Sequence, residues 1–157
     1  MKGILIILVL LSLGGCANNP LANSQMLART SLYEPLFLAS TASIPDKVEF
    51  KSLAIMYEQK IPAVFLPSEH LVITEKGVFL SEWQPSSYIF KHKLKIPFSE
   101  ITSVSNTVVE RQFWSNSEHL EIRVKSGDVF KFLLLDNGSN FAKSLIMARL
   151  HPHISKG

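Results

Sequence analysis

Residues 120–134 read LEIRVKSGDVFKFLL, a stretch with two strand-like halves around a glycine turn. Apolar and polar side chains alternate along both of its halves, as is typical of β-strands with one buried face. Ser126-Gly127-Asp128 separates the halves, and a glycine tolerates the positive φ that a tight hairpin turn needs. The stretch therefore predicts a hairpin formed by strands His119–Lys125 and Val129–Leu135.

Similar β-rich runs, separated by turn residues, extend upstream as far as Val48. Glu75-Lys76-Gly77 places a glycine at a second tight turn, where it would supply the positive φ of another hairpin. The remaining predicted strands are Val48–Tyr57, Ala63–Leu66, His70–Thr74, Val78–Trp83, Tyr88–Ile96 and Ser103–Glu110. Their order predicts an antiparallel, mainly β domain.

A helix is predicted after the last strand. Asp136-Asn137-Gly138-Ser139 ends the strand pattern and caps a helix over Asn140–Leu150. Phe141, Leu145 and Ala148 align at helical spacing, with Ala142 and Ile146 beside them, so this helix is expected to lie on the sheet.

Three segments carry a resemblance to a known superfold. HLVITEKGVFL (70–80), IPFSEITSV (96–104) and the 120–134 hairpin with its helix resemble pleckstrin-homology-like (PH-like) domains, especially GRAM-type and bacterial PH domains. The resemblance covers about Val48–Leu150 and implies a bent antiparallel barrel of about seven strands capped by one helix. It rests on core and turn features, so it carries over no catalytic residue. Residues 48–66 fit the first strands loosely, and other small barrels, including lipocalin-like ones, are the alternative fold.

The amino-terminal residues have the pattern of a signal peptide. Met1-Lys2 precedes an apolar run, Ile4–Leu13, of about ten residues, too short to span a hydrocarbon layer of ~30 Å as a helix. Leu13-Gly14-Gly15-Cys16 follows, and Cys16 is the only cysteine in the chain. A single cysteine cannot form an internal disulfide, so another use for this thiol is expected.

Leu13-Gly14-Gly15-Cys16 resembles the lipobox of bacterial lipoprotein precursors. The resemblance implies cleavage before Cys16, a diacylglycerol on its thiol and a further acyl chain on the new amine. Two or three such chains hold a protein firmly, because each buried methylene contributes ~0.8 kcal/mol. Ala17 stands where the enterobacterial signal for the inner membrane is typically Asp, which implies the periplasmic face of the outer membrane. The alternative is an uncleaved membrane helix, which Gly14-Gly15 would end early.

The predicted organisation has four parts: a signal peptide over 1–15, a lipidated cysteine and tether over 16–47, the PH-like domain over 48–150 and a tail over 151–157. Within the tether, Ser24–Tyr33 is predicted as a short helix with Asn23 or Ser24 as cap, ending before Pro35. Leu36-Phe37-Leu38 is too apolar for a free linker, so part of this segment is expected to pack on the domain or on a partner.

Three lysines form the first candidate site. YIFKHKLKIPF (88–98) is expected to place Lys91, Lys93 and Lys95 on one strand face, with Phe90, His92, Leu94 and Ile96 on the other. Such a stripe could attract anionic lipid headgroups or an anionic envelope polymer. The alternatives are a solvated strand face, or an edge strand that lysines protect from pairing.

An aromatic pair forms the second candidate site. RQFWSNSEH (111–119) joins two predicted strands and holds Phe113 and Trp114 among polar residues. These two side chains are expected either to anchor a partner or to cover the end of the barrel. Trp83 is expected to pack, and His92 is expected to be a core histidine whose ring a neighbour satisfies.

Composition argues against several function classes. The chain has 16 basic and 13 acidic residues, and loss of Lys2 with the leader leaves 15 basic residues and a net charge of +2, too weak for a nucleic-acid partner. The five histidines lack metal-ligand spacing, and no Gly-x-Ser-x-Gly, paired-carboxylate or phosphate-loop motif occurs. We therefore expect no metal, no cofactor and no enzyme activity.

The predicted function is that of a lipid-anchored module that binds a protein, a peptide or a lipid headgroup in the periplasm. The alternatives are a lipid-carrying or chaperone-like small barrel, which would need an apolar cavity, and a hydrolase of unrecognised type.

Overall fold

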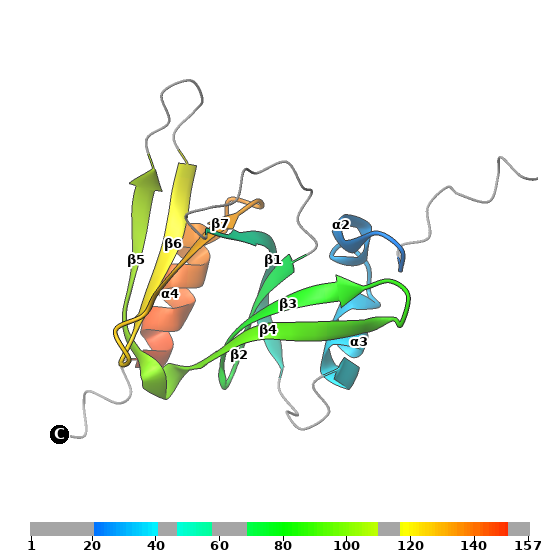
Figure 1. The fold of residues 1–157 in the computed structure, drawn as a ribbon, viewed down its shortest axis with the longest axis horizontal. Coiled ribbons are helices and arrows are strands. Elements are labelled where there is room, and N and C mark those ends of the chain that lie inside the picture. The colour runs from blue at the N-terminus through cyan, green and yellow to red at the C-terminus, as the bar shows by residue number, and fades with distance from the viewer. Residues whose placement is uncertain (1–20, 41–46, 58–68, 110–116, 151–157) are drawn as a thin grey trace, which may run out of the picture.

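The computed structural model describes residues 21–40, 47–57, 69–109 and 117–150. Seven strands form one antiparallel sheet in the order β4-β3-β2-β1-β7-β6-β5 (Figure 1). The strands are β1 (Val48–Met56), β2 (Glu69–Thr74), β3 (Gly77–Gln84), β4 (Ile89–Pro97), β5 (Ile101–Val109), β6 (Ser117–Val124) and β7 (Val129–Leu134). A 3-10 turn, η2 (Phe98–Glu100), joins β4 to β5, and helix α4 (Ser139–Leu150) follows the sheet. The prediction of a mainly β domain with seven strands and a carboxy-terminal helix is confirmed.

The sheet is bent but does not close into the expected barrel. β4 and β5 lie at opposite ends of the strand order, and no hydrogen-bonded pairing joins these two strands. β1 connects the two halves: its first part, from Val48 to Ala54, pairs with β2, and its last part, from Ala54 to Met56, pairs with β7. This arrangement is consistent with a PH-like bent sheet capped by a helix.

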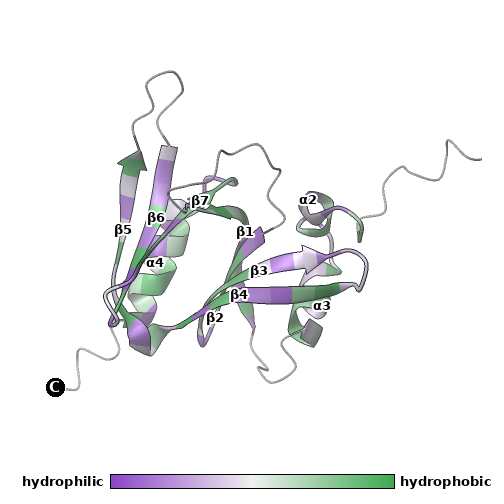
Figure 2. Ribbon diagram, in the orientation of Figure 1, coloured by the Kyte–Doolittle hydropathy of each residue, from purple (hydrophilic) through white to green (hydrophobic). Residues whose placement is uncertain are grey.

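The main core lies inside the bend. Residues from every strand contribute to it, and α4 covers them with Ala142 and Ile146, which are fully buried. Figure 2 shows apolar residues along α4 and along the strands beside it. Each large side chain withdrawn from water here contributes ~1.5–3 kcal/mol, so the helix is an integral part of the domain.

The two turn glycines are needed for different reasons. Gly127 has a φ of +95°, as the β6–β7 hairpin was expected to require. Gly77 does not have a positive φ; instead, a Cβ on it would lie 2.4 Å from the carbonyl oxygen of Ile96 on β4. Gly77 is therefore required by the close approach of two strands.

Within the described residues 21–40, two helices precede the sheet, where one was predicted. α2 (Ser24–Leu27) is capped by the Asn23 side chain, as expected, but it ends six residues before Tyr33. α3 (Tyr33–Ser40) contains Pro35 in its first turn. The predicted stop at Pro35 was wrong because proline is tolerated in a first turn, where a backbone N–H has no partner within the helix.

α2 and α3 cover the outer face of strands β2 to β4 (Figure 1). They bury a second apolar cluster on this face, which consists of Leu27, Tyr33, Phe37, Val72, Phe79, Trp83 and Phe90. The segment 21–40 therefore packs on the domain, whereas residues 16–20 and 41–46 of the predicted tether lie outside the described residues. The predicted strand Ala63–Leu66 lies outside the described residues.

Candidate functional site

The lysine stripe expected on β4 is divided by a β-bulge. The β3–β4 register advances from Leu80 opposite Leu94 to Ser81 opposite His92, so β4 has one extra residue, Lys93. An extra residue reverses the side-chain alternation beyond it. The prediction that all three lysines share one face is therefore wrong.

Contacts on either side of the bulge show the reversal. Phe90 and His92 face the outer cluster, and the His92 ring lies 5.5 Å from that of Phe37. Leu94 and Ile96 instead pack against the main core inside the bend. Lys95 shares the outer face with His92, with its Nζ 5.7 Å from the centre of the Phe79 ring.

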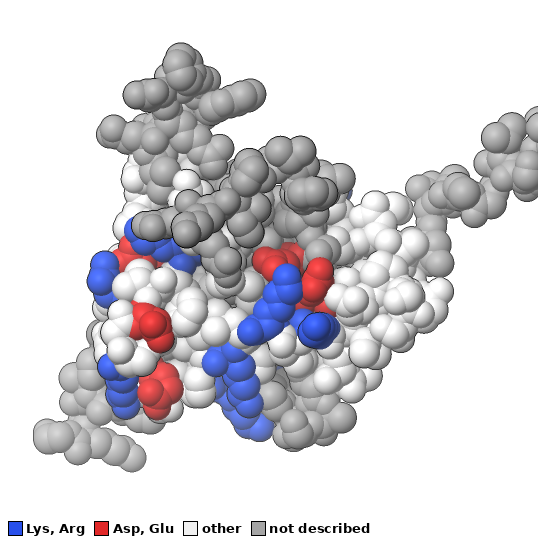
Figure 3. Space-filling view, in the orientation of Figure 1, with Lys and Arg blue, Asp and Glu red and all other residues white. Residues whose placement is uncertain are grey.

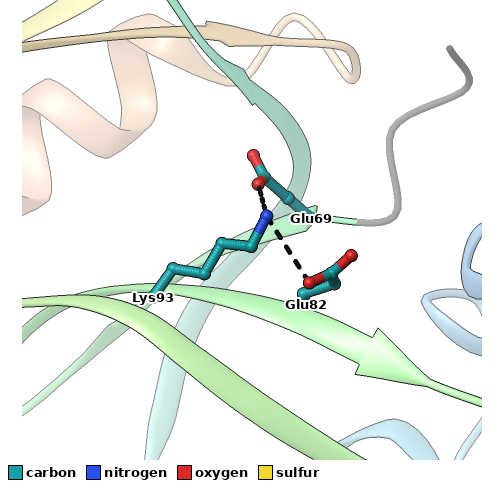
Figure 4. Close-up of polar contacts among 3 residues, drawn as sticks. All are labelled: Glu69, Glu82 and Lys93. Atoms are coloured by element: carbon teal, nitrogen blue, oxygen red, sulfur yellow. Dashed lines mark hydrogen bonds and ion pairs between the residues drawn. The ribbon is translucent and has the colours of Figure 1, made fainter.

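Lys93 connects the side chains of three strands (Figure 4). Its Nζ lies 2.6 Å from Glu69 Oε1 on β2 and 3.5 Å from Glu82 Oε2 on β3. Glu69 and Glu82 are directly opposite each other, so Lys93 separates two carboxylates that would otherwise repel. The hydrogen bond to Glu69 is the main cause of the raised pKa of Lys93. Lys93 stays protonated, and its positive charge is balanced by the carboxylates of Glu69 and Glu82. The central charge of the expected lysine stripe is therefore not available to bind an anion.

The charged side chains on the face shown in Figure 3 are mixed in sign. Acidic and basic groups lie next to one another over the sheet, whereas the end of the molecule formed by α2 and the β3–β4 hairpin is uncharged on this face. β4 is an edge strand, so the alternative in which lysines protect an exposed edge fits the strand order.

His92, which is half-buried, forms a hydrogen bond with a fully buried serine. Ser81 Oγ lies 2.6 Å from His92 Nδ1, and Ser81 is fully buried beneath the outer cluster. Burial lowers the pKa of His92; the backbone of Ser40 raises it and the charge of Lys95 lowers it further. Ser81 is thus the expected neighbour for one ring nitrogen of His92, Nδ1. A hydroxyl without solvent access cannot attack a substrate, so the pair is structural.

The segment 21–40 is held by polar contacts with the sheet. Trp83 is 2 % exposed, as expected of a packing residue, and its Nε1 donates a hydrogen bond of 2.6 Å to the carbonyl oxygen of Leu21. His70 Nε2 lies 3.2 Å from the carbonyl oxygen of Ser24. At the end of α3, Ser40 Oγ accepts a hydrogen bond of 2.8 Å from the backbone N–H of Phe90. These contacts were not foreseen, because the sequence gives no sign of which distant residue meets the segment.

The β3–β4 hairpin end exposes two apolar residues beside this segment. Tyr88 is 48 % exposed and Ile89 is 49 % exposed. Tyr88 has a φ of 54°, and its N–H bonds to the carbonyl oxygen of Gln84 at 2.9 Å. Its ring centre lies 6.4 Å from that of Trp83. The hairpin end is therefore continuous with the place where Leu21 meets the sheet.

The other predicted site residues lie outside the described residues. Cys16 belongs to 1–20, and Phe113 and Trp114 belong to 110–116, the connection between β5 and β6. Among the described residues no group of three or more His, Cys, Asp or Glu side chains could hold a metal ion. No helix in the described ranges has the length and apolar character to cross a membrane.

No protein-family model matches this chain, and no curated protein matches it.

Proposed function

We propose that this chain is a lipid-anchored protein of the bacterial envelope, held on the periplasmic face of the outer membrane by acyl chains on Cys16. The observation that carries the proposal is the Leu13-Gly14-Gly15-Cys16 sequence directly after a short apolar run. Its aliphatic residue, two small residues and cysteine have the order of a lipobox. Because the run is short, anchoring by lipid accounts for it better than a spanning helix does.

The folded body is proposed to be a non-enzymatic binding module. The Ser81 hydroxyl, which is hydrogen-bonded to His92, is fully buried, and this supports a role other than hydrolysis. A lipid carrier would need an apolar cavity, but the side chains of Leu120 and Phe132 are fully buried in one cluster with Ile146 of α4. Packing of this kind supports recognition at the surface.

Phe113 and Trp114 are the proposed partner anchor, in preference to the lysines of β4. Lys93 forms ion pairs with Glu69 and Glu82, and Lys95 lies on the opposite face of the sheet. The three lysines therefore cannot bind one anion together. An aromatic pair between β5 and β6 supplies the large apolar area typical of interface hot spots. The chemistry that it suits is a protein or peptide surface.

Lipidation can be tested by intact mass and by incorporation of labelled palmitate in a bacterial host. The mature protein is expected to begin at Cys16 and to carry acyl chains, and Cys16→Ser is expected to take up no label. A mature protein that still begins at Met1, or equal label in Cys16→Ser, would refute the anchor.

Partner binding can be tested by crosslinking in the native envelope. The double variant Phe113→Ala/Trp114→Ala is expected to lose crosslinked species that the parent protein forms. Val108→Ser is the matched control, because Val108 is 64 % exposed on the neighbouring strand β5. An unchanged set of crosslinks in the double variant removes the aromatic pair from the proposal.

A further inference from the structure

We propose that the end of the β3–β4 hairpin, through Tyr88 and Ile89, inserts into the surface of the lipid bilayer and fixes the orientation of the domain on it. This inference rests on the proposed lipid anchor at Cys16. It adds a second, non-covalent contact with the same membrane, made by residues that lie far from Cys16 in the sequence.

Only a short stretch of chain separates the proposed anchor from the folded body. Leu21 is five residues after Cys16 and is already fixed to Trp83 by a hydrogen bond. Five extended residues span at most ~18 Å, which is less than the ~30 Å diameter of a body of this size. Only the end of the domain that holds Leu21 can therefore face the bilayer.

The hairpin lies at that same end. Trp83 binds Leu21 through its indole N–H, and the Trp83 ring lies 6.4 Å from the Tyr88 ring, centre to centre. Figure 1 shows α2 beside the turn that joins β3 to β4, on the side of the molecule opposite β5. The anchor thus draws Tyr88 and Ile89 toward the lipid.

The chemistry of the hairpin suits the interface between water and lipid. Residues 83–90 read WQPSSYIF and contain no charged side chain, so insertion would desolvate no charge. A tyrosine ring is stabilised where its apolar body meets hydrocarbon and its hydroxyl meets headgroups, and isoleucine prefers the hydrocarbon itself. On the face shown in Figure 3, the uncharged surface extends from the hairpin to α2, where Met26 is 38 % exposed.

Backbone strain at Tyr88 is an independent sign of function. A φ of 54° is unfavourable for a bulky side chain, and glycine or asparagine would adopt it at lower cost. Tyr88 gains little burial in return, because about half of it is exposed. Strain kept at an exposed position points to a role that the isolated domain does not satisfy.

The test uses the full-length lipidated protein in vesicles of phosphatidylethanolamine and phosphatidylglycerol. Ile89→Cys supplies one reactive thiol for an environment-sensitive NBD dye, because the only native cysteine is proposed to be acylated. Val108→Cys is the matched control: Val108 is as apolar and at least as exposed, but it lies on the opposite edge strand. The parent protein is expected to take up no dye.

At position 89 the dye emission is expected to shift to the blue, and quenching by doxyl-labelled lipids is expected to be at least about twofold that at position 108. Adding Tyr88→Asn to the Ile89→Cys protein is expected to reduce this quenching by about half, since asparagine has no apolar ring. Its unfolding midpoint should stay the same or rise, because asparagine tolerates the φ of Tyr88. That variant separates membrane contact from folding.

Flotation and dye uptake test the lipid anchor, whereas dye emission and quenching test the hairpin contact. A protein that does not float with the vesicles, or a parent protein that takes up the dye, refutes the anchor, and the hairpin contact falls with it. A protein that floats but shows equal emission and quenching at positions 89 and 108 overturns the hairpin contact alone.

Discussion

The indole of Trp83 is joined to the carbonyl of Leu21 by a hydrogen bond of 2.6 Å, between residues 62 positions apart in the chain. Trp83→Phe keeps an aromatic ring but removes the donor and leaves a carbonyl without this partner. We expect the free energy of unfolding to fall by ~1–3 kcal/mol in a urea titration. Amide exchange of residues 21–28 should rise more than that of β6. Equal increases in both regions would contradict a local role for this bond.

Tyr33 carries a buried hydroxyl for which the described residues supply no hydrogen-bond partner. Tyr33→Phe removes that hydroxyl and keeps the ring contacts with Phe37 and Phe90. We therefore expect the free energy of unfolding to rise by ~1 kcal/mol, whereas Tyr33→Ala should lower it by ~3–5 kcal/mol through loss of packing. Chemical denaturation of both variants measures the difference. A loss of stability in Tyr33→Phe would show that the hydroxyl has a favourable partner.

The effect of Glu82→Gln should change sign with residue 93. With Lys93 present, this substitution removes an ion pair that is partly exposed and should lower the free energy of unfolding by at most ~1 kcal/mol. In Lys93→Met, the same substitution removes repulsion between Glu82 and Glu69, which face each other, and should raise stability. The two effects, measured by denaturation at low salt, should both shrink in high salt. The same sign in both backgrounds would mean that Lys93 does not separate the carboxylates.

Acid should weaken the domain through His92. Burial lowers its pKa, so the folded state holds the neutral ring while the unfolded chain binds a proton near pH 6.5. The resulting stability is present above pH 6.5 and is lost as the pH falls below it. Between pH 7 and pH 5, the urea midpoint of the parent protein should fall more steeply than that of His92→Gln. Ser81→Ala, which keeps the histidine, should retain the steep slope; identical slopes in the parent and His92→Gln would exclude this cause.

Substitution of the two turn glycines should give unequal losses. Gly77→Ala places a methyl group 2.4 Å from a backbone oxygen of β4, and neither strand can move without breaking its pairing. Gly127→Ala meets no atom within 4 Å and costs only the strain of its positive φ, ~1–2 kcal/mol. Thermal unfolding should therefore show the larger loss in Gly77→Ala. A larger loss in Gly127→Ala would contradict the structural reason given for Gly77.

The elements with one buried face could be predicted from sequence. The hairpin of β6 and β7 and the helix α4 appear within two residues of the expected bounds, because alternation and helical spacing directly reflect burial. The bulge at Lys93 could not be predicted, since KHKLK (91–95) alternates in the same way on both sides of the extra residue. For the same reason the shared face of the three lysines was an incorrect expectation.

The amino-terminal cover was predicted only in outline. The apolar Leu36-Phe37-Leu38 run indicated that this segment packs, and Phe37 is fully buried. Three consecutive apolar residues do not show which face a helix buries, and Pro35 resembles a stop until its place in the first turn is known. The proposal for Cys16 rests on a local sequence motif, whereas the Trp83–Leu21 contact depends on pairing between distant residues and could not be predicted.

The covering of the outer sheet face by α2 and α3 has a consequence for the order of assembly. Leu27 and Phe37 are synthesised before β2, β3 and β4, yet the cluster that buries them includes residues of those three strands. Contacts between distant residues form late, because a long loop must close before they contribute energy. The first part of the domain to leave the ribosome is therefore expected to reach its final position only after β2, β3 and β4 have been made.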